Sequence, residues 1–145
     1  MINVDIKILN EFAKMPTRGS AYAAGFDLYA ATNYDVSIMP HATEKIPIGI
    51  AVAIPDGYFG AIYARSGLAT KQGLRPANCV GVIDSDYRGE VIVALHNDTN
   101  DIRNIKAGDR IAQLIIQPCP DVELNLVDDL NNTDRGNGGF GSTGA

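Results

Sequence analysis

Hydrophobic and polar residues alternate with a period of two along most of this chain. The alternation is strictest over residues 46–54, where isoleucine or valine occupies every second position. The same alternation marks residues 4–8, 91–95 and 122–126. A period of two places every second side chain on the same face of a β-strand. The pattern therefore predicts strands in these four segments.

Residues 110–117 form a nearly continuous apolar run, which predicts a strand that is largely buried on both faces. Turn-forming residues separate the apolar segments, and no window shows the spacing of three and four that a core helix requires. One short helix is expected over residues 68–72, ended by Gly73. Many short strands in a chain of 145 residues predict an all-β, jelly-roll-like sandwich or barrel.

Two further features of the pattern concern how these strands pack. Alanine, glycine and proline occupy the alternate positions of residues 46–54, which indicates that the second face of this strand is also closely packed. We hypothesise that another subunit covers it. Apolar residues on both sides of the polar turn at residues 84–89 predict a hairpin over residues 81–91.

The last fifteen residues differ from the rest of the chain. Residues 131–145 contain five glycines and a single large apolar residue, Phe140. Such a segment buries too little surface to order itself, so a mobile tail is expected. The chain is accordingly predicted to consist of a β domain over residues 1–130 and a mobile segment over residues 131–145.

Composition narrows the classes of protein that fit. Twelve basic and seventeen acidic residues give a net charge of −5, which argues against nonspecific nucleic-acid binding. The longest apolar run, residues 48–54, is far shorter than the roughly 20 residues of a membrane span. Charged residues interrupt any apolar core near the N-terminus, so no signal peptide and a cytoplasmic location are expected. Cys79 and Cys119 are expected to be free and mostly buried, and the alternative is a single disulfide between them.

Residues with chemical potential gather in five short segments, which are residues 23–28, 64–69, 81–89, 108–114 and 135–144. In the second segment, an arginine, a serine and a glycine at a helix start suit anionic oxygens, although a surface arginine beside a serine N-cap is the plainer alternative. In the third segment, Asp84 follows two β-branched residues and could polarise a water molecule, although it could also be an ordinary turn residue.

The fifth segment matches the dinucleotide pattern G-x-G-x-x-G at residues 136–141, but it lacks the strand and helix that this pattern requires. A glycine-rich segment with an arginine, hydroxyl groups and an aromatic ring could still wrap phosphates while the ring covers a base. His41 and His96 lack metal-ligand spacing, so a zinc site is not expected.

Taken together and in this order, the five segments resemble the five motifs of the homotrimeric dUTPases, over residues 23–144. The one departure noted lies between motifs: Arg75-Pro76-Ala77 leads up to Asn78 where a more apolar strand is expected. The resemblance implies a jelly-roll subunit and a trimer with three sites at subunit boundaries. Each site would take phosphate-binding segments from one chain, a uracil-binding hairpin from a second and the glycine-rich tail from the third.

The resemblance also implies a reaction, in which dUTP and water give dUMP and diphosphate by attack at the α-phosphorus with Mg2+. This reaction keeps uracil out of DNA and supplies dUMP for dTMP synthesis. Asp84 matches the base that deprotonates the attacking water, and Asp27 matches the carboxylate that holds metal-bound water in an outer shell. The positions that match substrate contacts fall into four groups: Arg65, Ser66, Gly67 and Gln113 for phosphates; Asn78, Val82, Ile83 and Ile92 for the uracil edge; Tyr87 for the deoxyribose; and Arg135, Phe140, Gly141, Ser142 and Thr143 for a closing lid with Phe140 stacked on uracil.

Two rival functions stay open from the sequence alone. A dCTP deaminase of the same fold, with or without dUTPase activity, would release ammonia and need a general acid/base near the C4 position of cytosine. A non-catalytic jelly-roll module that binds or regulates a partner would release no diphosphate.

Overall fold

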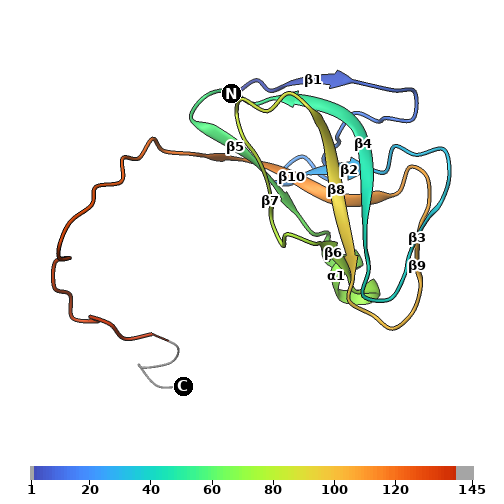
Figure 1. Cartoon of the computed structure of the whole chain (residues 1–145). Helices are drawn as coiled ribbons and strands as arrows, with labels where there is room; N and C mark the ends of the chain where they lie inside the picture. The colour runs from blue at the N-terminus through green and yellow to red at the C-terminus, as the bar shows by residue number, and fades with distance from the viewer. Residues whose placement is uncertain (1, 140–145) are drawn as a thin grey trace.

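The computed structural model of this chain describes residues 2–139, which form two four-stranded sheets and one short two-stranded ribbon (Figure 1). The first sheet has the order β1-β4-β8-β6, with strands Asp5–Ile8, Thr43–Ala53, Glu90–Asn97 and Leu74–Pro76. The second sheet has the order β2-β10-β5-β7, with strands Phe26–Tyr29, Arg110–Pro118, Tyr58–Tyr63 and Gly81–Ile83. The ribbon pairs β3, Val36–Ile38, with β9, Arg103–Ile105. The predicted all-β, jelly-roll-like class is confirmed.

One hydrophobic core takes buried side chains from both sheets. The alternating residues of β4 supply its largest share, since Ile46, Ile48, Ile50 and Val52 are all almost fully buried. From the second sheet, Leu28 on β2 and Leu114 on β10 join the same cluster. The strand predicted over residues 110–117 is β10. Ile111, Ala112 and Leu114 are buried, whereas Gln113 and residues 115–117 are only partly buried, so the burial predicted for both faces is incomplete.

At Gly49, the second face of β4 is covered by this chain itself. Gly49 has a φ of +70°, and a Cβ atom at this position would lie 2.6 Å from the Cβ of Ala13 and 2.8 Å from the Cβ of Ala31. The loops before and after β2 therefore press directly on the strand, and only glycine fits there. The close packing predicted for this face is real, but at Gly49 the hypothesis that another subunit provides it is wrong.

The only helix among residues 2–139 is α1, Ser66–Gln72, which begins two residues earlier than predicted. Its C-cap is Gly73, as the sequence indicates, in a left-handed conformation with a φ of +63°. No helix in this described part of the chain is long and apolar enough to cross a membrane. The cytoplasmic location stays a prediction.

The prediction of a hairpin over residues 81–91 is wrong. Strand β7 pairs with β5 in the second sheet, whereas β8 pairs with β4 and β6 in the first. Residues 84–89 therefore carry the chain from one sheet to the other. Alternation predicts that both segments are strands, but it does not tell which neighbour each one pairs with.

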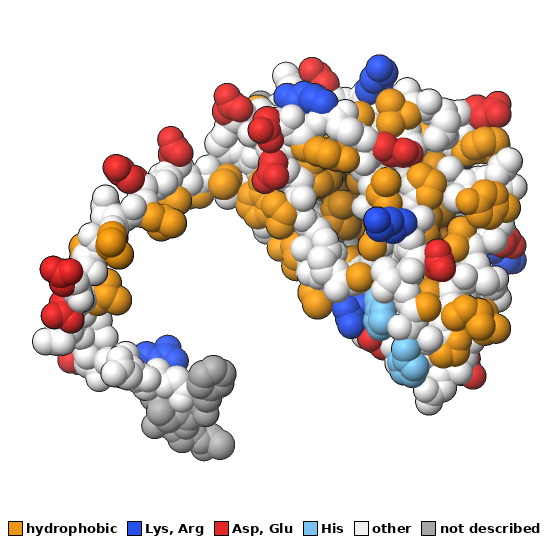
Figure 2. Space-filling view, in the orientation of Figure 1, with side chains coloured by type: hydrophobic (Ala, Val, Ile, Leu, Met, Phe, Trp, Pro, Cys, Tyr) orange, Lys and Arg blue, Asp and Glu red, His pale blue; other side chains and the backbone are white. Residues whose placement is uncertain are grey.

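The strand predicted over residues 122–126 is also absent. This segment follows β10 and runs away from both sheets, and Val122, Leu124 and Leu126 are 76, 94 and 102% exposed (Figure 1). Figure 2 shows hydrophobic side chains spaced along the segment among acidic ones. A single strand cannot satisfy its own backbone hydrogen bonds, and residues 2–139 offer it no partner strand.

Both cysteines are free, but they are exposed rather than buried. Cys79 lies in a turn that crosses between the sheets, and Cys119 follows β10 where the chain leaves the second sheet. The prediction that the two thiols are mostly buried is therefore wrong.

Candidate functional site

Asp27 and two arginines form a charged cluster on the second sheet. The Nε of Arg65 donates to Oδ1 of Asp27 at 2.9 Å, and Nη1 of Arg110 donates to Oδ2 at 3.1 Å. The guanidinium of Arg65 also donates to the carbonyl oxygen of Arg110 at 3.3 Å. Each carboxylate oxygen therefore accepts one charge-assisted hydrogen bond, and the three side chains hold one another in place.

Strand pairing explains why three segments of the sequence meet here. Strand β10 lies between β2 and β5, and Gln113 is the partner of Asp27 on one side and of Tyr63 on the other. The Nε2 of Gln113 donates to the carbonyl oxygen of Ala64 at 2.9 Å, which fixes the chain directly before Arg65. Segments 23–28, 64–69 and 108–114 are thus brought together by one central strand.

Gly25 lies directly against the side chain of Gln113. A Cβ atom at this position would lie 2.8 Å from Oε1 of Gln113, which is closer than nonbonded atoms approach in folded proteins. The glycine in the first segment therefore makes room for the side chain of the fourth segment.

The cluster carries one net positive charge and is open to solvent. The side chain of Asp27 is only 13% exposed, whereas those of Arg65 and Arg110 are 28% and 50% exposed. Ser66 and Gly67 follow at the start of α1, both exposed, and a Cβ atom at Gly67 would meet nothing within 4 Å. Arg65, rather than Ser66, occupies the N-cap position, and no side chain caps the helix. The serine N-cap alternative is therefore wrong, and the Ser66 hydroxyl is open to an anionic ligand.

A second group of predicted site residues surrounds the connection between β7 and β8. Asp84 is exposed, and its carbonyl oxygen accepts a hydrogen bond from the backbone N–H of Tyr87 at 3.2 Å. The hydroxyl of Tyr87 donates to the carbonyl oxygen of Glu90 at 3.0 Å. A Cβ atom at Gly89 would lie 2.6 Å from Cζ of Tyr87, so the ring rests directly on this glycine. The tyrosine ring is thereby held at the surface where the connection meets β8.

The residues predicted to contact uracil lie on either side of this connection. Strand β7 is at the edge of the second sheet, so one side of its backbone has no strand partner within residues 2–139. Ile83 is buried, whereas Val82 and Ile92 are 63% and 48% exposed. Asn78 lies in the exposed turn before β7. Unpaired backbone groups beside an exposed amide side chain can pair with the edge of a planar base.

Asp84 and the charged cluster lie at opposite ends of β5, whereas Gly81, the partner of Ile62, and the Asn78 side chain beside it lie toward the cluster's end. Gln113 is the partner of Tyr63 on β5, whereas Ile83 is the partner of Gly60. Continuing this register places Asp84 next to Phe59, four residues along β5 from Tyr63 and two strand spacings away from Gln113. Strand geometry then separates the backbones of Asp84 and Gln113 by about 17 Å. One chain alone does not bring Asp84 to the Asp27–Arg65 cluster.

Arg135 lies on the segment that leaves the sheets, and its Nε donates to the carbonyl oxygen of Gly138 at 2.8 Å. The other predicted lid residues lie outside the described residues, namely Phe140, Gly141, Ser142 and Thr143. Among residues 2–139, no three histidine, cysteine, aspartate or glutamate side chains form a group that could hold a metal ion.

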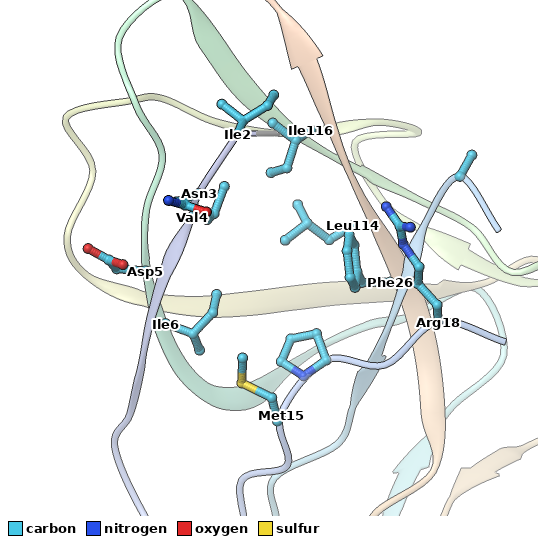
Figure 3. A pocket seen from close by; sticks show the side chains of 12 residues that line it. Ile2, Asn3, Val4, Asp5, Ile6, Met15, Arg18, Phe26, Leu114 and Ile116 are labelled. Carbon is cyan, nitrogen blue, oxygen red and sulfur yellow. The ribbon is translucent and has the colours of Figure 1, made fainter. Parts of the chain in front are cut away.

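A cleft of about 620 Å³ opens elsewhere, between β1 and the β2–β10 edge (Figure 3). Its apolar wall includes Ile6, Phe26 and Leu114, and the guanidinium of Arg18 lies 4.7 Å from the centre of the Phe26 ring. None of the residues that line this cleft is a predicted site residue. Most of the predicted site residues instead lie on open surfaces.

The family model of the dUTPases matches residues 11–144. The chain belongs to the dUTPase family. A deoxyuridine 5'-triphosphate nucleotidohydrolase of Desulfitobacterium hafniense strain DSM 10664 / DCB-2 is 49% identical over 132 residues, which cover 90% of this chain and 87% of that protein. The resemblance in the five segments is therefore confirmed.

Solved structures of dUTPases also share the fold. A point mutant of the dUTPase of Staphylococcus bacteriophage 80alpha, with dUpNHpp, has a TM-score of 0.89 and 29% identity, and both chains are fully covered. A point mutant of the dUTPase from phage phi11 of S. aureus has a TM-score of 0.78 and 28% identity over 88% of this chain and 98% of that one. Its structure is described as revealing the coordination of a structural Mg(II) ion.

Arg110 is the site residue that sequence reasoning missed. It lies in the fourth segment, but the resemblance assigned no role to it. Arg110 lies at the start of β10, and the pairing of β10 with β2 brings it beside Asp27. Sequence alone does not give this register.

Proposed function

We propose that this protein hydrolyses dUTP to dUMP and diphosphate, with water attacking the α-phosphorus. Membership of the dUTPase family supports the activity of a dUTP diphosphatase. The observation that carries the proposal is the convergence of Asp27, Arg65, Arg110 and Gln113 from three segments of the sequence. This cluster offers the exposed guanidinium of Arg110 and the partly exposed one of Arg65 to a polyanionic ligand, although the chain as a whole is acidic.

In this proposal the triphosphate binds at the cluster. The Arg65 guanidinium is already oriented by Asp27, so little side-chain entropy is lost when it meets a phosphate. The hydroxyl of Ser66 and the open backbone at Gly67 add hydrogen-bond donors beside it. The amide of Gln113 adds a further polar contact at the same edge of the sheet.

The residues present fit a magnesium ion that is held mainly by the substrate. Mg2+ keeps several of its waters and takes few direct protein ligands when it binds nucleotide phosphates. Each oxygen of Asp27 accepts one arginine hydrogen bond and keeps a second lone pair, which can accept a metal-bound water. When bound, the ion would neutralise charge on the phosphate oxygens.

Asp84 is the proposed base. It is exposed, its backbone is fixed by Tyr87, and its carboxylate can accept a proton from a water molecule aligned with the α-phosphorus. Catalysis of phosphoryl transfer depends mainly on such positioning and on charge neutralisation.

The substrate's base and sugar would bind beside Asp84. Asn78 and the free backbone edge of Val82 and Ile83 would pair with uracil, together with the backbone of Ile92. The fixed ring of Tyr87 would pack against the deoxyribose and leave no room for a 2′-hydroxyl. A cytosine presents a donor where uracil presents an acceptor, so dCTP would leave a buried polar group unpaired.

The separation of about 17 Å between the backbones of Asp84 and Gln113 within one chain supports a shared site. In the proposed homotrimer, Asp84 of one copy faces the charged cluster of Asp27, Arg65 and Arg110 on the next copy, which we call the phosphate cluster. The exposed side chains of residues 122–126 then gain a partner surface on a neighbouring copy, which carries the tail toward a third site. Arg135, Phe140, Gly141, Ser142 and Thr143 would close over the bound nucleotide, as a mobile lid over residues 131–145.

Diphosphate release tests this proposal. Purified protein with Mg2+ is incubated separately with dUTP, dCTP, dTTP and UTP, and pyrophosphatase converts the released diphosphate to phosphate for a colorimetric assay. We expect rapid release from dUTP alone, with dUMP as the second product. Ammonia released from dCTP would identify a deaminase instead, and no release from any nucleotide would indicate a binding module.

A further inference from the structure

Arg75 makes an unusually complete set of contacts for a residue on an edge strand. Its Nε and Nη2 donate to the two carboxylate oxygens of Asp98, at 2.7 and 3.0 Å. This bidentate pair joins β6 to the end of β8. Hydrogen bonding from Arg75 lowers the pKa of the Asp98 carboxyl below its ordinary value, so both groups are charged at neutral pH.

The same guanidinium also reaches the turn that carries Asn78. Its Nη1 donates to the carbonyl oxygen of Pro76 at 3.3 Å and contacts Sγ of Cys79 at 3.7 Å. Cys79 has a φ of +64°, a conformation that non-glycine residues seldom adopt and that the surroundings must hold. Arg75 therefore contacts the chain both before and after Asn78, the residue that is proposed to pair with uracil.

A row of polar side chains supports this arrangement across the first sheet. His96 on β8 is the strand partner of Thr43 on β4 and of Arg75 on β6. Nδ1 of His96 hydrogen-bonds the Thr43 hydroxyl at 2.9 Å, and Nε2 lies 3.5 Å from Oδ1 of Asp98. The backbone N–H of Asp98 donates to the carbonyl oxygen of Gly73 at 2.9 Å. Asp98 is thus fixed independently of Arg75 and can act as its anchor.

The geometry points to Arg75 as a positioning residue for the base: anchored by Asp98, it holds the 77–80 turn in the shape that presents Asn78 to uracil. This inference rests on the proposed function. It also accounts for Arg75-Pro76-Ala77, where the family resemblance led us to expect a more apolar strand. Exposed ion pairs contribute little to folding stability, so the benefit of this one is expected in the turn's shape.

Kinetics of an Arg75→Gln variant test the inference against the wild type. We expect KM for dUTP to rise roughly tenfold while kcat changes less than about twofold, because the turn contacts the base and not the reacting phosphorus. Discrimination between dUTP and dCTP should fall by a similar factor. Inhibition by inorganic diphosphate, which probes the phosphate cluster alone, should stay unchanged, and the melting temperature should stay within about 3 °C of wild type.

Asp98→Asn weakens the anchor of Arg75 without altering β6. The two single variants and the double variant together form a double-mutant cycle. If Asp98 acts through Arg75, the double variant behaves like Arg75→Gln alone rather than showing additive losses. Lys7→Gln is the matched control, because it removes one positive charge from β1 at the opposite edge of the same sheet. It should keep the wild-type KM.

The outcomes separate this inference from the proposed function. Wild-type protein that fails to hydrolyse dUTP refutes the proposed function, and the positioning role falls with it. Wild-type activity combined with unchanged KM and discrimination in Arg75→Gln refutes the positioning role alone. Equal weakening of dUTP and diphosphate, together with a large drop in melting temperature, assigns Arg75 a merely structural role and also overturns the inference.

Discussion

Replacing Asp27 with asparagine removes the charge at the centre of the phosphate cluster while keeping the shape of the side chain. In the wild type, Asp27 is 13% exposed and accepts hydrogen bonds from Arg65 and Arg110 at 2.9 and 3.1 Å. Hydrogen bonds to charged groups contribute about 1.5–3 kcal/mol each. An asparagine retains one acceptor oxygen but turns its amide group toward the other arginine, so we expect a loss of about 2 kcal/mol in unfolding free energy.

A loss of this size should be visible in both stability and activity. For a chain of 145 residues it lowers the melting temperature by several degrees, about 4–8 °C. Arg65 loses the partner that orients it, and in the proposed site a metal-bound water would also lose its charged acceptor. KM for Mg-dUTP should therefore rise at least tenfold, and more Mg2+ should be needed for half-maximal activity.

Thermal unfolding and steady-state kinetics check this result together. Asp56→Asn is the matched control, since Asp56 is exposed in the turn before β5, and it should leave both quantities unchanged. If Asp27→Asn shows the wild-type melting temperature and the wild-type KM, Asp27 does not organise the cluster and the reasoning is refuted.

Three further predictions concern the other parts of the site. Asp84→Asn should keep dUTP affinity by calorimetry but lower kcat by about 10²–10⁴; an unchanged kcat removes Asp84 from the role of base. Deletion from Arg135 onward should preserve the circular-dichroism spectrum and the trimer mass while abolishing efficient hydrolysis, and normal kcat/KM in the truncated protein would leave the tail without a catalytic role. Tyr87→Ala should hydrolyse UTP measurably, because the ring no longer occupies the space of a 2′-hydroxyl; complete rejection of UTP would show that another group excludes ribose.

The sequence predicts the fold well where one face of a strand is buried. Ile46, Ile48 and Ile50 alternate because they face the core, so β4 can be located from its pattern. Pairing is harder, because a strand's partner depends on the whole sheet. The same apolar pattern describes β7 and β8, yet β7 belongs beside β5 and β8 beside β4 and β6.

Residues 122–126 show a second limit of prediction from hydrophobic alternation. Their alternation is as clear as that of β1, but these side chains are exposed in the single chain. Hydrophobic alternation indicates that a segment packs against something, without telling whether the partner is in the same chain. At Gly49 the packing partner lies in the same chain, because Ala13 and Ala31 fill the space.

The candidate site was predictable in its residue types but not in its geometry. Arg65 and Gln113 could be named from motifs, whereas the Asp27–Arg110 pair depends on a register shift between β2 and β10 that no local pattern reveals. The distance between Asp84 and Gln113 likewise follows only from the pairing of β5 with both of its neighbours.

Mixed trimers test the central claim most directly, which is that Asp84 of one copy serves the phosphate cluster of another. Arg65→Gln and Asp84→Asn subunits, each inactive alone, are unfolded together in equal amounts and refolded. In a shared site, half of the phosphate clusters are intact and half of the facing aspartates are intact, so about a quarter of wild-type activity should return. If both groups act within one chain, every site lacks one of them, and a mixture that stays inactive although mixed trimers form would contradict the account.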